Sequence, residues 1–495
     1  MNYLKVNLWG DELGRLVWDP SCRRTYFMFN PKASGRPDVS PLANPAASWI
    51  ADIPIFGDSR RIYQGLPPFI ADSLPDSWGN RLFDQWARQA RISRSKITPL
   101  FKLMFIGRRG MGALEFEPAA AELEHAYPVD IDKLYDLSVK ILEERESVVI
   151  DASDDLSMKA LLAAGTSAGG RQMKAIIAMN PTTGQIRSGQ TDVLDGFDYY
   201  IIKFEDKEVP TTEIEMSYYD MATACGIEME ECRMIEVEGV SHFMTRRFDR
   251  RNGEKVHMQT LAAINPEADS YEELMETCQK LELSDRELTE VFRRLVFNVL
   301  GGNTDDHNKN FSFMLEKGGS WRLAPAYDLT FIFNSFGTDA EPDHELSIYG
   351  KTSDITKEDL MEFAKEHGIR DAETVINEVA HAVAGFPALA DKYRIPTRWR
   401  HIIRKTLREN LTRVGYLETP VTETRFTDSI GREIRNISVS NNTRGNYHIT
   451  ALVNDCPRKR VVGPKAGAYA RLQQYELGNL DRLEFRSLIE NLFAD

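Results

Sequence analysis

Three side chains between residues 305 and 328 have the types and spacing of a phosphoryl-transfer site. Asp305 and Asn310 lie five positions apart, and Asp328 follows eighteen positions after Asn310. Enzymes that transfer phosphoryl groups use an aspartate to orient and deprotonate the attacking hydroxyl. They use an amide oxygen and a second carboxylate to hold the metal ions that bridge the ATP phosphates. We therefore predict Asp305 as the catalytic residue, and Asn310 and Asp328 as magnesium ligands.

His307 lies two positions after the predicted catalytic aspartate. At that place it could stabilise charge on the transferred phosphoryl group. A histidine hydrogen-bonded within the loop is an equally good interpretation. The whole segment also has a simpler alternative, because a polar turn after the apolar helix expected over 288–300 would have a similar composition.

A kinase also needs a cation on the ATP phosphates, and Lys203 is the candidate. It closes an apolar strand expected over 198–204, where its ammonium must meet an anion or solvent. In kinases the anion is the α/β-phosphate pair, and a glutamate on the next helix steadies the lysine. Glu215, in a helix expected over 213–225, is the predicted partner. An ordinary lysine at a sheet edge is the alternative.

A glycine-rich turn over 165–174 precedes another predicted strand. Glycines let successive backbone N–H groups converge on an anion, which makes a nest for phosphate. The spacing is neither a Walker A loop nor a dinucleotide-binding fingerprint, and a flexible hairpin is about as good an interpretation. Thr166 and Ser167 carry hydroxyls inside this turn. Phosphorylating either would place about −1.5 to −2 charges in the nest and compete with ATP phosphates.

The segment Met244–Arg251 runs from a predicted strand into a turn, where a hinge between two lobes would lie. Its backbone groups could pair with adenine, and Phe248 could pack near the base. A basic strand end is the alternative interpretation.

Composition limits the other classes of function. The chain has 495 residues, 42% hydrophobic and 27% charged, which suits a globular protein of two to four domains. A net charge of −14 argues against a nucleic-acid-binding surface over the whole chain. No apolar run approaches the roughly 20 residues that cross a bilayer, and the start lacks an apolar signal core, so we expect a cytoplasmic protein without a membrane partner. The five cysteines are dispersed and fit reduced thiols.

With these pieces in order, the chain resembles the HipA family, the serine/threonine-kinase toxins of bacterial toxin–antitoxin modules. The resemblance covers roughly residues 1–415. The motifs that carry it are Leu66–Gly79, Ile106–Leu114, the 165–174 turn, Ile202–Phe204, the Glu215 helix, Arg247–Arg250, Thr304–Phe311 and Pro325–Asp328.

The resemblance implies an α+β, protein-kinase-like two-lobed fold with a β-rich N-terminal subdomain and an all-helical C-terminal lobe. We expect a HipA-like N-terminal subdomain over 1–150, a small lobe over 151–255, a helical catalytic lobe over 256–415 and an extension of unknown role over 416–495. The resemblance implies ATP and Mg²⁺ as cofactors and assigns further ATP contacts. These fall on Ser167, Ala168, Gly169, Gly170, Lys203, Glu215, Arg246 and Phe248.

The resemblance also implies autophosphorylation of Ser167 or Thr166, which would eject the glycine-rich loop and switch the kinase off. The implied partners are a small helix-turn-helix antitoxin that carries most of the contact with operator DNA, and a protein substrate of the translation machinery such as an aminoacyl-tRNA synthetase. Arg246 stands where other members often have Glu, which matters little if the adenine contact is made by backbone.

Two other functions remain open. The segment Asp305–Asn310 also resembles the catalytic loop of phosphatidylinositol kinases, although the acidic chain offers no basic amphipathic face for a membrane. The second alternative is an inactive kinase fold that acts as a co-repressor with its antitoxin. The intact set of Lys203, Asp305, Asn310 and Asp328 argues against that alternative.

Overall fold

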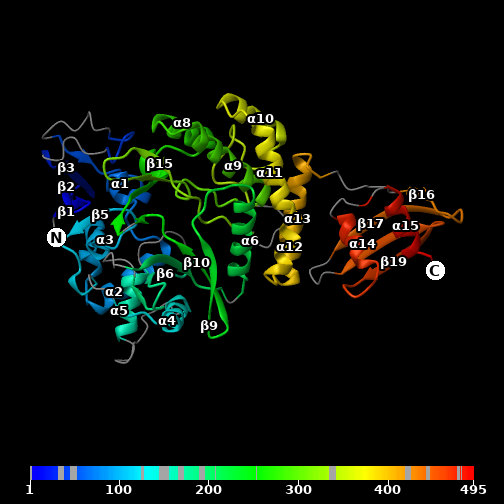
Figure 1. Cartoon of the computed structure of the whole chain (residues 1–495), viewed down its shortest axis with the longest axis horizontal. Helices are drawn as coiled ribbons and strands as arrows, with labels where there is room; N and C mark the ends of the chain where they lie inside the picture. The colour runs from blue at the N-terminus through cyan, green and yellow to red at the C-terminus, as the bar shows by residue number, and fades with distance from the viewer. Residues whose placement is uncertain are drawn as a thin grey trace.

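In the computed structural model, the chain passes from a sheet-rich N-terminal part through a helical middle to a separate C-terminal sheet (Figure 1). The structure describes residues 3–31, 38–44, 53–123, 127–143, 155–165, 172–188, 196–206, 208–251, 253–333, 342–417, 425–441, 446–476, 480 and 482–494. Within these ranges, no helix has both the length and the apolar character that a membrane span requires.

The N-terminal part is an antiparallel five-stranded sheet in the order β4-β3-β2-β1-β5. Its first strand alternates as the sequence predicts, because Leu4, Val6 and Leu8 face the core while the residues between them are more exposed or polar. Short helices follow, and Asp76 caps α2 by accepting a hydrogen bond from the Gly79 N–H. The elements are β1 (Tyr3–Leu8), β2 (Asp11–Asp19), β3 (Arg24–Phe29), β4 (Ile55–Phe56), η3 (Arg61–Tyr63), α1 (Pro68–Ala71), α2 (Ser77–Gln89), η4 (Arg94–Lys96), α3 (Pro99–Ile106), β5 (Leu114–Glu117) and η5 (Ala121–Leu123).

The small lobe is a second antiparallel five-stranded sheet, in the order β7-β6-β8-β10-β9, with helix α6 packed against β9 and β10. It shares one hydrophobic core with the N-terminal sheet, since Ala175 and Ile202 of the small lobe belong to the same buried cluster as Leu4 and Trp78. The two parts are therefore joined by packing as well as by the chain. The elements are α4 (Ile131–Glu143), α5 (Asp155–Ala164), β6 (Lys174–Met179), β7 (Ile186–Ser188), β8 (Asp198–Lys203), α6 (Thr211–Ala224), β9 (Cys232–Val237) and β10 (Val240–Arg246).

The catalytic lobe is built around helix α9, which is buried among α8, α11 and α13. Ser284 and Glu287 form a capping box at its start, and Gly302 ends it in the left-handed conformation. The chain then enters the loop that carries Asp305. The helices are α7 (Leu261–Ile264), α8 (Tyr271–Lys280), α9 (Asp285–Gly301), α10 (Lys357–Glu366), α11 (Ala372–Ala384), α12 (Phe386–Lys392) and α13 (Thr397–Arg413).

The α+β, two-lobed fold class is confirmed, but the catalytic lobe is not entirely helical. A three-stranded sheet, β13-β14-β15, flanks the Asp305 loop, and a small hairpin, β11-β12, precedes it. Every residue of β14 is buried, so this strand lacks the alternation that marks a strand in sequence. The strands are β11 (Arg250–Arg251), β12 (Glu254–Lys255), β13 (His257–Thr260), β14 (Ser312–Leu315) and β15 (Trp321–Leu323).

The C-terminal segment forms a four-stranded antiparallel meander with two helices and its own hydrophobic core. It lies beyond helix α13 at the far end of the molecule (Figure 1). One contact between the two is a hydrogen bond of 3.1 Å between the Asn441 amide and the His401 ring. The elements are β16 (Arg425–Thr427), β17 (Glu433–Asn441), β18 (Tyr447–Val453), β19 (Cys456–Val462), α14 (Tyr469–Glu476) and α15 (Arg482–Leu492).

Candidate active site

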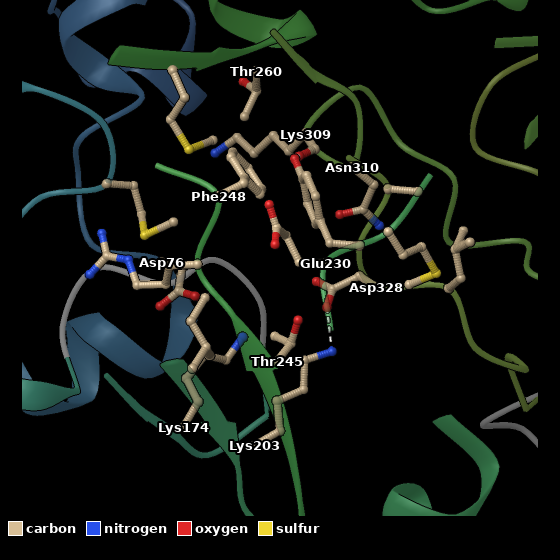
Figure 2. Close-up of a pocket in the computed structure, with 18 of the residues that line it drawn as sticks. Asp76, Lys174, Lys203, Glu230, Thr245, Phe248, Thr260, Lys309, Asn310 and Asp328 are labelled. Atoms are coloured by element: carbon tan, nitrogen blue, oxygen red, sulfur yellow. Dashed lines mark hydrogen bonds and ion pairs between the residues drawn. The ribbon is translucent and has the colours of Figure 1, made fainter. Parts of the chain in front are cut away.

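A cleft between the small lobe and the catalytic lobe collects side chains that are far apart in the sequence (Figure 2). Strand β8 and helix α6 supply one wall, and the loops after α9 and β15 supply the opposite wall. The predicted residues that line this cleft are Lys203, Glu215, Arg246, Phe248, Asp305, His307, Asn310 and Asp328.

Lys203 forms ion pairs with both Glu215 and Asp328. The Lys203 and Glu215 side chains are only 9% and 7% exposed, whereas the Asp328 side chain is 29% exposed. Burial works against the charged ammonium, but the two carboxylates outweigh it and raise the pKa of Lys203 above its ordinary value. Lys203 is thus bound both by Glu215 of helix α6 in the small lobe and by Asp328 of the catalytic lobe.

Asp328 has a backbone conformation that is unusual for a residue with a side chain. Its φ is 55°, in the left-handed region. Burial would raise the pKa of this carboxyl, but Lys203 and Lys174 hold it below the ordinary value. The preceding ring is fixed, because the Tyr327 hydroxyl donates to the Lys309 carbonyl at 2.8 Å. The chain therefore turns sharply to present an ionised carboxylate to the cleft.

The loop after α9 presents Asp305 and Asn310 together. The Asn310 side-chain amide donates to the Asp305 backbone carbonyl at 2.7 Å, which closes the loop. The Asp305 side chain is 56% exposed, and His307 Nε2 lies 3.9 Å from Asp305 Oδ1, beyond hydrogen-bond distance. His307 Nδ1 instead accepts the Lys309 N–H at 3.2 Å. The histidine makes the loop hydrogen bond of the alternative interpretation and also lines the cleft.

The residue that anchors this loop is Asp306, which sequence reasoning did not single out. It is 1% exposed and accepts hydrogen bonds from the Tyr271 hydroxyl at 2.6 Å and from the Glu345 N–H at 2.9 Å. The His344 ring lies 2.8 Å from the same carboxylate. An aspartate beside a catalytic candidate, with no pattern of its own, gives no sequence signal for such a role.

The predicted hinge lies at the cleft, but the backbone N–H groups of Arg246 and Arg247 are already hydrogen-bonded. Arg246 N donates to the Glu231 carbonyl at 2.9 Å, and Arg247 N donates to the Tyr199 carbonyl at 2.8 Å. Phe248 is 8% exposed, and its ring lies 6.0 Å from that of Tyr327. An aromatic wall is therefore present beside the hinge, whereas a base contact through these two N–H groups is not available.

The glycine-rich loop cannot be placed in the same way. Thr166, Ser167, Ala168, Gly169 and Gly170 lie outside the described residues. Their predicted contacts with ATP and the predicted phosphorylation of Ser167 or Thr166 remain predictions.

The N-terminal subdomain supplies cleft residues that sequence reasoning missed. Asp72 and Asp76 both line the cleft. The Asp72 carboxylate accepts hydrogen bonds from the Thr260 N–H at 2.8 Å and from the Thr260 hydroxyl at 2.7 Å. Burial raises the pKa of Asp72 and raises that of Asp76 to about 6. The Leu66–Gly79 motif contains both aspartates, but the sequence of the motif alone does not show that they reach the cleft.

Besides the contact of Asp72 with Thr260, a buried contact centred on Asp249 connects the N-terminal subdomain to the predicted hinge, and we call it the Asp249 joint. Asp249 is fully buried between Arg247 and Arg250, each of which donates to its carboxylate at 2.8 Å. The Gly112 N–H donates to the same carboxylate at 2.7 Å, and Arg250 returns a hydrogen bond to the Gly110 carbonyl at 3.0 Å. The Ile106–Leu114 and Arg247–Arg250 motifs are thus two halves of one buried contact.

The donor set at the cleft fits magnesium. Asn310 and Asp328 offer one amide oxygen and one carboxylate, and Figure 2 shows both side chains on the same wall. Mg²⁺ usually takes one or two protein oxygens and completes its shell with water and substrate phosphates. Among the described residues, no group of three or more His, Cys, Asp or Glu side chains could hold a metal ion alone. Magnesium held by Asn310 and Asp328 would complete its shell with water and phosphate oxygens.

Two lobes, a lysine–glutamate pair and an aspartate-bearing loop define the class of protein-kinase-like folds. Residues 4–117 match the HipA N-terminal domain, and residues 166–386 match the HipA-like C-terminal domain. Together these matches cover more than half of the chain, which belongs to the HipA family. HipA of Shewanella oneidensis MR-1, solved with HipB and operator DNA, shares this fold. The TM-score is 0.56 and the identity 16%, over 83% of this chain and 96% of that one.

Curated relatives are similar over much of their length. The putative kinase Y4dM of Sinorhizobium fredii is 24% identical over 79% of this chain and 93% of its own. The putative kinase Y4mE of the same organism is 24% identical over 68% of this chain and 84% of its own.

Proposed function

We propose that this protein is an ATP- and Mg²⁺-dependent serine/threonine protein kinase of a toxin–antitoxin module. The observation that carries the proposal is the convergence of Lys203, Glu215 and Asp328 with Asp305 and Asn310 in one cleft. A phosphoryl-transfer site needs this set, and the five residues come from four separate segments of the chain.

Each side chain has a role in the proposed reaction. Asp305 accepts the proton of the acceptor hydroxyl as the oxygen of that hydroxyl bonds to the γ-phosphorus of ATP, while the bond from the γ-phosphorus to the β,γ-bridging oxygen breaks and ADP leaves. The exposure of the Asp305 side chain leaves room for a protein substrate. Lys203 binds the α/β-phosphates, and Glu215 keeps its ammonium oriented. Asn310 and Asp328 would hold magnesium, which supplies charge neutralisation on the phosphate oxygens. His307 lines the cleft, where it stabilises charge on the transferred phosphoryl group.

The proposed partners follow from the family and its solved member. HipA of Shewanella oneidensis was solved with HipB and operator DNA, which supports a small DNA-binding antitoxin for this chain too. We infer a cytoplasmic protein whose substrate belongs to the translation machinery, such as an aminoacyl-tRNA synthetase. Ser167 or Thr166 is the proposed site of autophosphorylation.

The test is purified protein incubated with Mg-ATP, beside the Asp305→Gln variant, followed by phosphopeptide mass spectrometry. We expect phosphate on Ser167 or Thr166 of the wild type and none on the variant. Equal labelling of both proteins would indicate a contaminating kinase and would remove the proposed activity. Phosphate transferred to phosphatidylinositol vesicles but not to protein would assign a lipid kinase instead.

A further inference from the structure

A second pocket, of about 250 Å³, adjoins the predicted hinge and is lined mainly by charged side chains. Its walls come from the start of β8, the end of β10 and the β11–β12 hairpin. The residues proposed to hold the nucleotide phosphates and magnesium, Lys203, Asn310 and Asp328, line the cleft and not this pocket. The charged residues of its lining are Asp198, Glu230, Arg246, Arg247, Arg250 and Arg251.

Two of these arginines form ion pairs at the partly exposed rim of the pocket. Arg246 pairs with Asp198 at 2.6 Å, and its side chain is 44% exposed. Arg251 pairs with Glu230 at 3.2 Å, and its side chain is 38% exposed. Each rim cation therefore has a carboxylate beside it that also lines the pocket.

The other two arginines form the buried floor of the pocket. Arg247 and Arg250 both donate to the carboxylate of Asp249, so two guanidinium charges meet a single counter-charge. Burial lowers the pKa of Arg250 to about 10, and the positive charge of Arg247 acts in the same direction. A bound anion would oppose this effect of Arg247.

Arg247 keeps one donor without an acceptor. Its Nε and Nη2 each donate to Asp249 at 2.8 Å, whereas its Nη1 is buried and has no hydrogen-bond partner among the described residues. The residue is only 2% exposed and lines the pocket. A buried charged donor without an acceptor is costly, which indicates that Nη1 serves an acceptor in the pocket.

We propose that this pocket, the hinge anion pocket, binds a phosphate group, free or as a monoester, separately from the nucleotide. A guanidinium matches the oxygens of a phosphate with parallel N–H donors, and the charge of a phosphate balances the excess at the floor. Arg247 supplies the buried donor, and Arg246 and Arg251 lie at the rim, where they contact the remaining oxygens. The inference goes beyond the proposed kinase reaction and does not depend on it.

The test is calorimetric titration of the full-length protein with inorganic phosphate and with O-phosphoserine, in the absence and in the presence of saturating Mg-ADP. We expect at least one of the two anions to bind, and Mg-ADP to change its affinity by less than about twofold, because the nucleotide occupies the cleft and not this pocket. Tighter binding of O-phosphoserine would identify a monoester as the ligand. Equal or tighter binding of inorganic phosphate would identify the free anion.

Two rim variants should change this affinity in opposite directions. Arg251→Gln removes a cation from the lining, so we expect the affinity to fall about threefold to tenfold. Asp198→Asn removes a carboxylate and releases Arg246, so we expect the affinity to rise about twofold to fivefold. Arg322→Gln is the matched control, since it removes an exposed ion pair with Glu316 away from both pockets, and it should bind as the wild type does.

Both rim residues lie outside the Asp249 joint, so the variants should keep the unfolding midpoint in urea within the range of the control. Binding of neither anion by the wild type, displacement of the anion by Mg-ADP, or unchanged affinity in both rim variants would overturn the inference. Failure of the wild type to bind Mg-ADP would instead overturn the proposed function, and the opposite effects of the two variants would still support the pocket.

Discussion

Asp305 and Asp306 are neighbours in sequence with opposite surroundings. The Asp305 side chain is 56% exposed in the cleft, whereas Asp306 is buried under Tyr271, His344 and Glu345. The first is available to a substrate, and the second holds the loop that carries the first. Asp305 is therefore the residue proposed for chemistry and Asp306 the residue for stability, and substituting each one alone can distinguish the two roles.

We expect Asp305→Ala to abolish phosphoryl transfer while changing the free energy of unfolding by less than about 1 kcal/mol. Asp306→Ala leaves buried donors without an acceptor and should cost about 2–4 kcal/mol. Urea unfolding and phosphate transfer, measured on both variants, check this pair. Comparable destabilisation by the two substitutions would contradict the assignment.

Asp249 gives a prediction about pH. Burial would raise the pKa of this carboxyl, but Arg247 and Arg250 hold it well below its ordinary value of 3.8. A carboxyl with a lowered folded-state pKa contributes stability that is complete above its unfolded pKa and is lost as the pH falls through the folded pKa. Asp249→Asn should cost about 3–5 kcal/mol at neutral pH, because two buried arginines lose their counter-charge.

The measurement is urea unfolding of the wild type and Asp249→Asn at a series of pH values. The difference in unfolding free energy should be constant above about pH 5 and should narrow below about pH 4. A difference that stays constant down to pH 2 would show that the carboxylate charge does not stabilise this joint.

At the scale of elements, the sequence predicts helices and strands that have a local apolar pattern, but not the contributions that depend on contacts between distant segments. The helix expected over 213–225 is α6 (Thr211–Ala224), and the strand expected over 198–204 is β8 (Asp198–Lys203). Both have the runs of apolar residues that local rules recognise. Strand β14 is buried on both faces and lacks the alternation by which a strand's bounds are located in a sequence. The contribution of Asp72 was missed because it depends on a contact with Thr260, 188 positions away.

The end of helix α9 yields a prediction about packing. Gly302 has φ +63°, and an added Cβ would lie 3.2 Å from side-chain atoms of both Phe331 and Thr406. Gly368 has φ +74° with nothing within 4 Å of such a Cβ. Gly368→Ala should cost about 1 kcal/mol for its backbone alone, and Gly302→Ala about 2–3 kcal/mol because crowding adds to the strain. Equal costs in denaturant unfolding would show that the crowding is relieved.

At the scale of the molecule, the C-terminal meander is separate from the cleft. Its core is a distinct buried cluster over 426–493, and the residues that line the cleft all lie before position 330. A chain ending at Leu417 should therefore fold and bind Mg-ATP within about twofold of the full-length protein, because no cleft contact is removed. Calorimetric titration of the shortened chain checks this. A larger loss would show that the meander supports the cleft through α13.

The buried contact between Gly112 and Asp249 has a consequence for protein engineering. A Cβ at position 112 would lie 2.8 Å from the Met258 backbone nitrogen, and φ there is +71°, so glycine is required on that side of the joint. On the other side, Asp249 must remain charged to satisfy its arginines. A chimera that takes residues 1–120 from one relative and the remainder from another should assemble only when the first supplies glycine at position 112 and the second supplies aspartate at position 249. The two segments of such a chimera must therefore be chosen together.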